Sequence, residues 1–248
     1  MLAIIGGSGL TRLSTLAIAH REVVRTPYGE PSSALIFGQI AERDVVFLAR
    51  HGHGHTIPPH RVNYRANLWA LKQRGVDAIL AVASVGSIVS GHVPGDLVLP
   101  HQLVDYSSGR ESTFFDGGDR KVVHVDFTQP YTPALRTRCL AAARSAGIEL
   151  HDGGVYAAVS GPRLETAAEI DRIERDGATL VGMTGMPEAV LARELGLAYA
   201  SISVVVNHAA GRGDSAECVS LERIVGVLET AMEQVRRLID HVVAHDSP

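Results

Sequence analysis

The sequence predicts an α/β fold with one mixed or mostly parallel sheet and flanking helices. Short apolar runs typical of buried strands alternate along the chain with amphipathic or capped segments typical of helices. No linker, repeat or low-complexity tract interrupts the 248 residues, of which 46% are hydrophobic. A chain of this length and composition can bury one large core, so we expect a single domain over residues 1–248.

In the first half of the chain, strands are expected where a short apolar run ends at a turn residue. The expected strands are Leu2–Ile5, Ala34–Ile40, Asp44–Ala49, Ala78–Ala83 and Leu97–Leu99. One helix is expected among them, over Tyr64–Arg74. It contains Trp69, the only tryptophan, and stops at Gly75.

Helices of the second half carry recognisable start and stop signals. Thr132 can cap a helix with Pro133 at its first position, and this helix ends at Gly147. Thr166-Ala-Ala-Glu169 is a capping box for a helix that reaches Asp176. The other expected elements are strands at Gly154–Val159, Thr179–Gly182 and Ala198–Val206, a helix at Pro187–Leu195, and a long amphipathic helix from Ser220 onward.

Charge and cysteine content exclude several classes of function. The net charge of −4 makes nucleic acid an improbable partner, because phosphate backbones need a basic surface. Cys139 and Cys218 are isolated, which favours a reducing compartment without disulfides. Met1–Ile5 lacks the basic start of a signal peptide, and the longest apolar stretches are too short to span a bilayer. We therefore expect a cytoplasmic protein with no membrane contact.

A glycine turn follows the first strand at Gly6-Gly7-Ser8-Gly9. Glycines allow backbone N–H groups to approach an anion, and Ser8 adds a hydroxyl. The turn lacks the third glycine of a dinucleotide-binding motif and the Lys-Ser/Thr of a P-loop. A purely structural turn is therefore the alternative reading.

Basic and histidine residues follow the strand that ends at Ala49. The guanidinium of Arg50 suits phosphate oxygens, and His51, His53 and His55 form a His-x-His-x-His run. Such a run also occurs in metal-dependent hydrolases. No convincing set of further ligands completes a metal site, so a metal hydrolase is kept only as an alternative of a different class.

Asn207 closes the apolar run that begins at Tyr199. In α/β enzymes, ligands bind just beyond the carboxyl ends of strands. A side-chain amide can donate and accept side by side, as the O6/N7 edge of a purine requires. Asn207 is therefore a candidate for reading a purine base, with a strand-end turn residue as the alternative.

Several segments, taken together, resemble the trimeric purine nucleoside phosphorylases, and most closely the methylthioadenosine phosphorylase branch. They are Ile4–Leu10, Ala49–His53, Val62–Lys72, Gly161–Arg163 and Val181–Glu188, and they fall in the family's order and spacing. The resemblance implies a single α/β domain with a central, partly barrel-like mixed sheet. It implies a homotrimer with its site near the subunit interface. It also implies phosphorolysis of a nucleoside with inorganic phosphate as co-substrate and no metal or organic cofactor.

The resemblance also implies roles for individual residues. Arg50, His51 and Asn207 would be catalytic, and Met183 would lie under the sugar. The phosphate would be held by Ser8, Arg50, His51, Ala83, Ser84 and Thr184.

The base pocket departs from the methylthioadenosine branch at two positions. Asn207 stands where that branch has Asp, and Glu165 stands where it has a small polar residue. A carboxylate accepts from N1–H of a 6-oxopurine but opposes N1 of adenine, which is itself an acceptor. The alternative for Glu165 is a helix-start carboxylate. Neighbouring positions depart as well: His208-Ala209 replaces a segment that holds a second Asp, and Leu164 stands where a stacking Phe is common.

At the sugar end, the resemblance places Val219 beside the 5′ position, where ordinary purine nucleoside phosphorylases have His. Valine suits a methylthio group, and His55 of a neighbouring subunit could line the same pocket. The expected substrate is therefore 5′-methylthioinosine, giving hypoxanthine and 5-methylthioribose 1-phosphate in purine salvage. The alternatives are a methylthioadenosine phosphorylase and a general inosine/guanosine phosphorylase. A nucleoside-binding protein without activity is disfavoured because the phosphate residues are complete.

Overall fold

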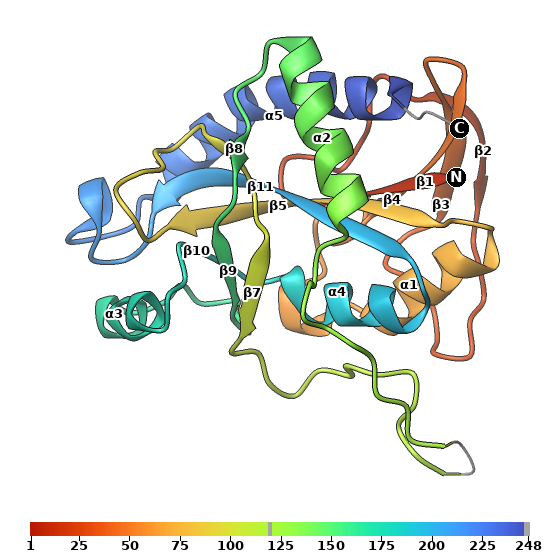
Figure 1. Ribbon diagram of the computed structural model, residues 1–248, viewed down its shortest axis with the longest axis horizontal. Coiled ribbons are helices and arrows are strands. Elements are labelled where there is room, and N and C mark those ends of the chain that lie inside the picture. Colours follow the sequence, from red (N-terminus) through yellow and green to blue (C-terminus); the bar gives the residue numbers. More distant parts are fainter. Residues whose placement is uncertain (119–120, 246–248) are drawn as a thin grey trace.

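Eleven strands form one mixed sheet in the computed structural model (Figure 1), which describes residues 1–118 and 121–245. The strands are β1 Leu2–Gly6, β2 Ala17–Glu22, β3 Leu35–Ile40, β4 Arg43–Ala49, β5 Ala78–Ser87, β6 Leu97–Leu99, β7 Gln102–Asp105, β8 His151–Asp152, β9 Val155–Ala158, β10 Leu180–Gly182 and β11 Ala198–His208. β1, β4, β5 and β11 run parallel to one another. Their carboxyl ends therefore meet at one edge, where the sequence predicted a site.

The ladder closes on itself around β5. One side runs from β5 through β11 to β6, and the other runs from β5 through β10 and β9 to β7. β6 continues into β7 after only Pro100 and His101. The β6–β8 and β7–β9 ladders share one register, because Val98 pairs with His151 and Gln102 pairs with Val155. The expected α/β fold with a partly barrel-like mixed sheet is thus confirmed.

Helices cover both faces of the sheet. They are α1 Tyr64–Gln73, α2 Pro133–Ala146, α3 Ala167–Arg175, α4 Gly185–Glu194 and α5 Leu221–Ala244, with single 3₁₀ turns at Pro59–Arg61 and Gly213–Ser215. In Figure 1, α2 and α5 lie on one face, whereas α1 and α4 lie on the other. None of these helices, within the described residues, is long and apolar enough to cross a bilayer.

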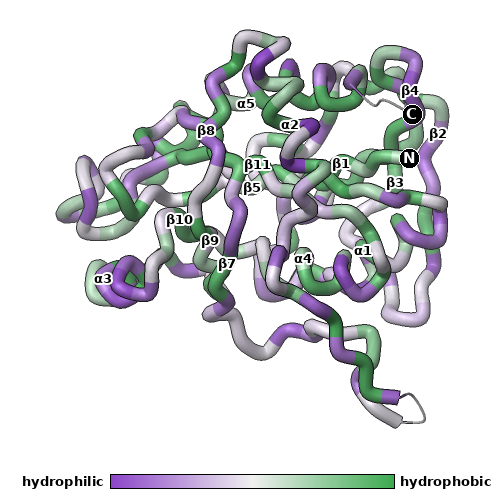
Figure 2. The backbone as a smooth tube through the Cα atoms, in the orientation of Figure 1, coloured by the Kyte–Doolittle hydropathy of each residue, from purple (hydrophilic) through white to green (hydrophobic). Residues whose placement is uncertain are grey.

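The alternation of side chains along β1 explains the two layers. Leu2 and Ile4 pack into the core that contains α2 and α5, and Ala3 and Ile5 pack into the core that contains α1 and α4. A strand buried on both faces has no polar alternation. The central strands are accordingly coloured hydrophobic along most of their length in Figure 2, whereas α3 alternates between hydrophilic and hydrophobic residues.

Three strands were not expected from the sequence. β2 has no fully buried residue, so it lacks the apolar pattern that marks a strand. β7 is only partly buried and β8 has two residues. These strands exist because neighbouring ladders complete them, which a local pattern does not reveal.

Two central strands are longer than expected, and one cap differs. β5 continues past Ala83 to Ser87, and β11 continues past Val206 to His208. Asn207 therefore lies within the paired strand rather than just past it. The Thr132 hydroxyl makes no cap; it accepts the Tyr199 N–H at 3.0 Å. The capping box at Thr166 and the cap at Ser220 are present.

Candidate active site

A cavity of about 480 Å³ opens where the parallel strands end. Gly7 and Ser8 follow β1, Arg50 and His51 follow β4, and β5 supplies residues 83–86. The sequence-predicted residues on its wall are Ser8, Arg50, His51, His55, Ala83, Ser84, Leu164, Glu165, Met183, Thr184 and Asn207. The fold thus brings together most of the candidate residues, although they come from distant parts of the chain.

Three candidate residues lie outside this wall. His208 directs its Nδ1 to Asp214 Oδ1 at 2.7 Å, and Ala209 is buried in a small apolar cluster with α3. Val219 lies just before α5, and its contact with the 5′ group stays a prediction. The apolar side chain that α5 does contribute to the wall is Ile224.

Arg50 is held by a buried ion pair. Its Nε and Nη2 donate to the two carboxylate oxygens of Glu188 at 2.7 and 2.8 Å. Both side chains are at most 1% exposed, and Tyr199 donates a third hydrogen bond to Glu188 at 2.8 Å. Burial alone would lower the pKa of Arg50, but the charge and hydrogen bonds of Glu188 outweigh it and raise the pKa. The guanidinium therefore stays charged in the cavity wall.

The remaining group of the fork, Nη1, donates to the carbonyl oxygen of Val82 in β5 at 2.9 Å. Gly7 permits this approach, since a Cβ on residue 7 would lie 2.9 Å from Nη1 and 2.6 Å from the Val82 oxygen. A guanidinium carries five N–H groups, and three bonds leave two for a ligand. Arg50 is consequently fixed in position before an anion arrives.

His51 is nearly buried, and its Nδ1 lies 2.8 Å from the carbonyl oxygen of Ile57. A carbonyl only accepts, so Nδ1 carries the proton. Burial, followed by the nearby charge of Arg50, lowers the pKa of His51 to about 4. The ring is neutral at pH 7, which leaves Nε2 as an acceptor. A phosphate oxygen without a proton would therefore meet a lone pair of this ring, and the role of His51 in holding phosphate stays a prediction.

His55 of the same chain also lies on the wall. Its Nε2 is 3.5 Å from Ser8 Oγ, and its ring centroid is 4.8 Å from that of His51. The chain's own His55, in a backbone conformation with φ of 51°, thus lines the cavity, and a contribution from the His55 of a neighbouring subunit stays a prediction. His53 and His60 are exposed and do not line the cavity.

Thr184 lies at the amino end of α4. Its side chain is 6% exposed, and its N–H donates to the buried Tyr156 hydroxyl at 3.2 Å. Its hydroxyl makes no cap bond to the helix. Met186 has a non-helical backbone with φ of −120° and ψ of 141°, so the regular part of α4 begins beyond it, and Thr184 offers an anion its hydroxyl rather than the start of a helix.

Met183 is positioned by contacts that the sequence did not reveal. Arg110 Nη1 donates to the Met183 carbonyl at 2.8 Å, and Arg110 Nη2 donates to the Ser160 carbonyl at 2.8 Å. Gly161 lies against the Met183 side chain, because a Cβ there would be 2.4 Å from the sulfur atom. Arg110 thus ties the segments before and after β10 together beneath the cavity.

Asn207 follows a bulge in β11. Val205 pairs with Val85 and Asn207 pairs with Gly86, which leaves Val206 as the extra residue. The Asn207 Nδ2 donates to the His208 carbonyl at 2.6 Å. This bond fixes the amide, so that Oδ1 and the second N–H of Nδ2 remain available side by side.

Glu165 lines the same cavity as Asn207. Burial raises the pKa of its carboxyl group, and the nearby charge of Glu169 raises it further. The carboxylate is therefore poorly solvated and gains from a ligand N–H. Leu164 beside it is 37% exposed, which leaves the position without a stacking ring.

A family model of the phosphorylase superfamily matches residues 1–244. The chain belongs to the phosphorylase superfamily. The resemblance to purine nucleoside phosphorylases that the sequence showed is therefore confirmed.

Relatives and solved structures agree with this membership. A protein named probable S-methyl-5′-thioinosine phosphorylase, from Pseudomonas syringae pathovar tomato, is 52% identical over 242 residues, covering 98% of both chains. The 6-oxopurine nucleoside phosphorylase of Pyrococcus furiosus is 44% identical over 243 residues, covering 96% of this chain and 90% of its own. The methylthioadenosine phosphorylase of Schistosoma mansoni, solved in complex with adenine, is 34% identical with a TM-score of 0.94, covering 98% of this chain and 90% of that chain.

Sequence reasoning missed four residues of this phosphorylase's site: Glu188, Tyr199, Arg110 and Ile224. Glu188 had a detectable signal, because a lone carboxylate in the otherwise apolar segment 186–192 requires a partner when buried. Arg110 had none, since it lies in a long irregular segment and bonds mainly to backbone oxygens that are distant in sequence.

Proposed function

We propose that this phosphorylase cleaves 5′-methylthioinosine with inorganic phosphate, giving hypoxanthine and 5-methylthioribose 1-phosphate for purine salvage. The reaction needs no metal or organic cofactor, and residues 1–248 act as one phosphorylase domain. One observation carries the proposal: groups suited to an anion and groups suited to a 6-oxopurine lie at two ends of the same wall.

The anion end and the base end lie at different positions along β5. Arg50 bonds to Val82, and Asn207 pairs with Gly86. Four residues of strand span roughly 13 Å, which is room for a base, a ribose and a phosphate in line. Ser8, Arg50 and Thr184 form the anion end, whereas Glu165 and Asn207 form the base end. A nucleoside bound between them presents C1′ to the phosphate.

The base end suits the product base. In hypoxanthine protonated at N7, the edge presents N7–H as donor and O6 as acceptor. The two free groups of Asn207, Oδ1 and one N–H, match this edge, and Glu165 accepts from N1–H. Adenine presents an amino donor and an unprotonated N1, which leaves both residues mismatched. Unpaired buried polar groups can discriminate by about 10⁴-fold.

The mechanism follows from where charge develops. As the C1′–N9 bond lengthens, the sugar becomes cationic and the base anionic. Phosphate held by Arg50, Ser8 and Thr184 faces the cation, and one of its oxygens then forms the bond to C1′ as the C1′–N9 bond breaks. Asn207 stabilises the leaving base most strongly once N7 has taken a proton from solvent, because its Oδ1 opposes an unprotonated N7. An interaction that improves as the bond breaks raises kcat.

Apolar side chains predominate at the proposed sugar end. Ile57, Pro58, Pro59 and Ile224 line the cavity there, and only their neighbours His55 and Thr56 can bond a 5′-hydroxyl. This apolar lining favours a methylthio group as the 5′ substituent. The names of the Pseudomonas and Pyrococcus relatives support the 6-oxopurine base, and the first of them also supports the methylthio group.

We also propose a cytoplasmic homotrimer, as the family resemblance implies. Leu221 and Val225 of α5 are 68% and 56% exposed, and they adjoin Ile224 on the cavity wall. Exposed apolar side chains beside a site fit a subunit contact. Light scattering after size exclusion measures the assembly, and a monomeric mass rejects this part of the proposal.

Initial rates of phosphorolysis of methylthioinosine, methylthioadenosine and inosine, compared at equal enzyme and phosphate, test the proposal. Methylthioinosine should show the highest kcat/KM, by about 10²-fold or more over methylthioadenosine. No base should be released without phosphate. Faster cleavage of methylthioadenosine rejects the assignment of Glu165 and Asn207 to the base.

A general 6-oxopurine nucleoside phosphorylase is the second candidate. It is favoured by the absence of Val219 from the wall of the cavity and by the activity named for the Pyrococcus relative. Equal kcat/KM for inosine and methylthioinosine would establish this candidate in place of the first.

A further inference from the structure

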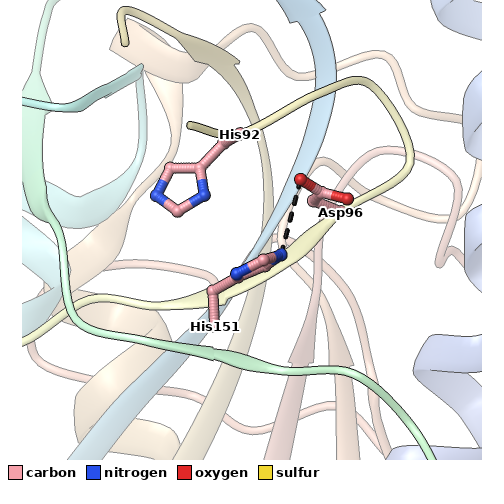
Figure 3. A group of neighbouring side chains, drawn as sticks. All are labelled: His92, Asp96 and His151. Carbon is pink, nitrogen blue, oxygen red and sulfur yellow. Dashed lines mark ion pairs between the residues drawn. The ribbon is translucent and has the colours of Figure 1, made fainter. Parts of the chain in front are cut away.

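A second group of functional side chains lies outside the cavity, at the junction of β5, β6 and β8 (Figure 3). His92 and Asp96 belong to the connection between β5 and β6, and His151 begins β8. One donor atom from each side chain lies within 4.8 Å of the other two. The three residues are half-buried, and the fold brings His151 to His92 and Asp96, which lie on one connection.

The spacing of the donors is close to that of a metal site. His151 Nε2 is 3.5 Å from Asp96 Oδ2. Zinc–nitrogen and zinc–oxygen bonds of about 2.0–2.1 Å place neighbouring tetrahedral ligands roughly 3.3 Å apart. The distance between these two atoms is thus close to that of two ligands on one ion. The same distance is too long for a good direct hydrogen bond. The His92 donor lies within 4.8 Å of the other two, so the ring has to move closer to complete the set.

His92 lacks a partner that would explain its position. Its Nδ1 is buried and makes no hydrogen bond with any described residue. In Figure 3, one nitrogen of the ring is turned toward Asp96 and His151, and the His92 and His151 rings meet edge to face at 5.0 Å. A metal ion would give this buried nitrogen the partner that it lacks.

A fourth ligand is also within reach. Glu149 Oε1 is 4.0 Å from His151 Nε2, and its side chain is 87% exposed. An exposed carboxylate can rotate inward at little cost, or water can take the fourth position. Asp96 is already oriented, since its Oδ2 accepts the Val93 N–H at 2.8 Å, and ligands fixed by such secondary bonds favour metal binding.

We propose that His92, Asp96 and His151 bind a zinc-type divalent cation. Two imidazoles and one carboxylate are borderline ligands that suit Zn²⁺ better than Mg²⁺ or Ca²⁺. The site is separate from the nucleoside cavity and takes no part in phosphorolysis.

The cation would act as a structural clip between the β5–β6 connection and β8. The same connection is bonded to β11, because Gly95 N–H donates to the Val205 carbonyl at 2.8 Å and Val205 N–H donates to the Asp96 carbonyl at 2.9 Å. Val205 is two residues before Asn207. Zinc binding would therefore hold the end of the strand that carries Asn207.

Zinc content after dialysis of the full-length protein against buffered Zn²⁺ tests this site. The variants are His92→Gln, Asp96→Asn and His151→Gln, and the matched control is His60→Gln, which changes an exposed histidine outside both sites. We expect the wild type and His60→Gln to retain one more equivalent of zinc per chain than each cluster variant. Zn²⁺ should also raise the Tm of the wild type and His60→Gln, but not of the cluster variants.

Circular dichroism and phosphorolysis in chelator-treated buffer check that each variant is folded, and folded cluster variants should keep wild-type rates there. Equal zinc content in the wild type and in all three folded cluster variants overturns the proposal. An equal loss of zinc in His60→Gln does so too, because it shows that exposed histidines bind the metal without a built site. Neither result bears on which nucleoside is cleaved.

Discussion

Replacing Glu188 with alanine should destabilise the protein more than any surface substitution. Glu188→Ala removes the two hydrogen bonds to Arg50, at 2.7 and 2.8 Å, and the one from Tyr199, at 2.8 Å. The Arg50 guanidinium is 1% exposed and would be left charged without its partner. The substitution therefore perturbs both the stability of the core and the anion end of the cavity.

The magnitude follows from the desolvation of Arg50. Removing one partner of a buried ion pair typically costs about 3–5 kcal/mol, because the other charge stays buried. Replacing both charges avoids that cost. We therefore expect the double variant Arg50→Met/Glu188→Leu to be more stable than Glu188→Ala by about 2 kcal/mol or more. It should nevertheless be inactive, since Arg50 is lost.

Urea unfolding at one fixed protein concentration measures these free energies, because assembly links stability to concentration. Glu229→Ala, on the exposed face of α5, is the control and should change the free energy of unfolding by about 0.5 kcal/mol or less. The KM for phosphate should rise in Glu188→Ala and stay unchanged in Glu229→Ala.

Two results would refute the reasoning. A loss below about 1 kcal/mol in Glu188→Ala would mean that Arg50 finds other partners or water. The double variant could also lose as much free energy of unfolding as the single variants Arg50→Met and Glu188→Leu lose together. That result would mean that the two side chains stabilise the fold independently rather than as a pair.

Three further predictions concern the base end and His51. Asn207→Asp should shift the ratio of kcat/KM for methylthioinosine over methylthioadenosine toward the 6-amino substrate by about tenfold or more; an unchanged ratio would show that residue 207 does not contact the base. Glu165→Ala should lower kcat/KM for 6-oxopurine nucleosides by about 10–100-fold, as expected for one hydrogen bond to a charged group, with a smaller effect on methylthioadenosine. His51 has a folded-state pKa of about 4 and an ordinary value of 6.5, so its neutral form favours folding above pH 6.5. That contribution is lost as the pH falls from 6.5 through 4, by up to about 3 kcal/mol. The difference in unfolding free energy between the wild type and His51→Gln should be smaller at pH 4.5 than at pH 7. A difference that is the same at both pH values would contradict the assignment.

The sequence predicted those strands that the fold buries on both faces, because burial gives them a continuous run of apolar residues. β1, residues 45–49 of β4 and residues 204–206 of β11 are continuously apolar because both of their faces are covered. The helices α3 and α5 were found from Thr166, Glu169 and Ser220, because capping chemistry is local. β2 was missed since its exposed residues carry no such pattern. Apolar runs and helix caps therefore identified the central strands and these helices, but they did not identify the edge strand β2.

The cavity could be predicted only in part for a related reason. Ser8, Arg50 and Asn207 each follow or end a recognisable strand, so parallel strands place them at one edge. The bulge at Val206 cannot be read from the sequence, although it decides which way Asn207 faces. Arg110 and Glu188 act through distant backbone and side-chain contacts. Those contacts exist only after the chain has folded.

The state of His51 constrains how the anion end works. Its proton is on Nδ1, held by the Ile57 carbonyl, and a second proton is disfavoured by burial and by Arg50. A phosphate oxygen without a proton would meet only a lone pair at Nε2. In the proposed reaction, direct donation to an unprotonated oxygen would therefore come from Arg50, Ser8 and Thr184, and His51 would accept a hydrogen bond from a P–O–H group. Such a contact would orient the protonated oxygen toward His51 and leave the charged oxygens for Arg50 and for attack on C1′.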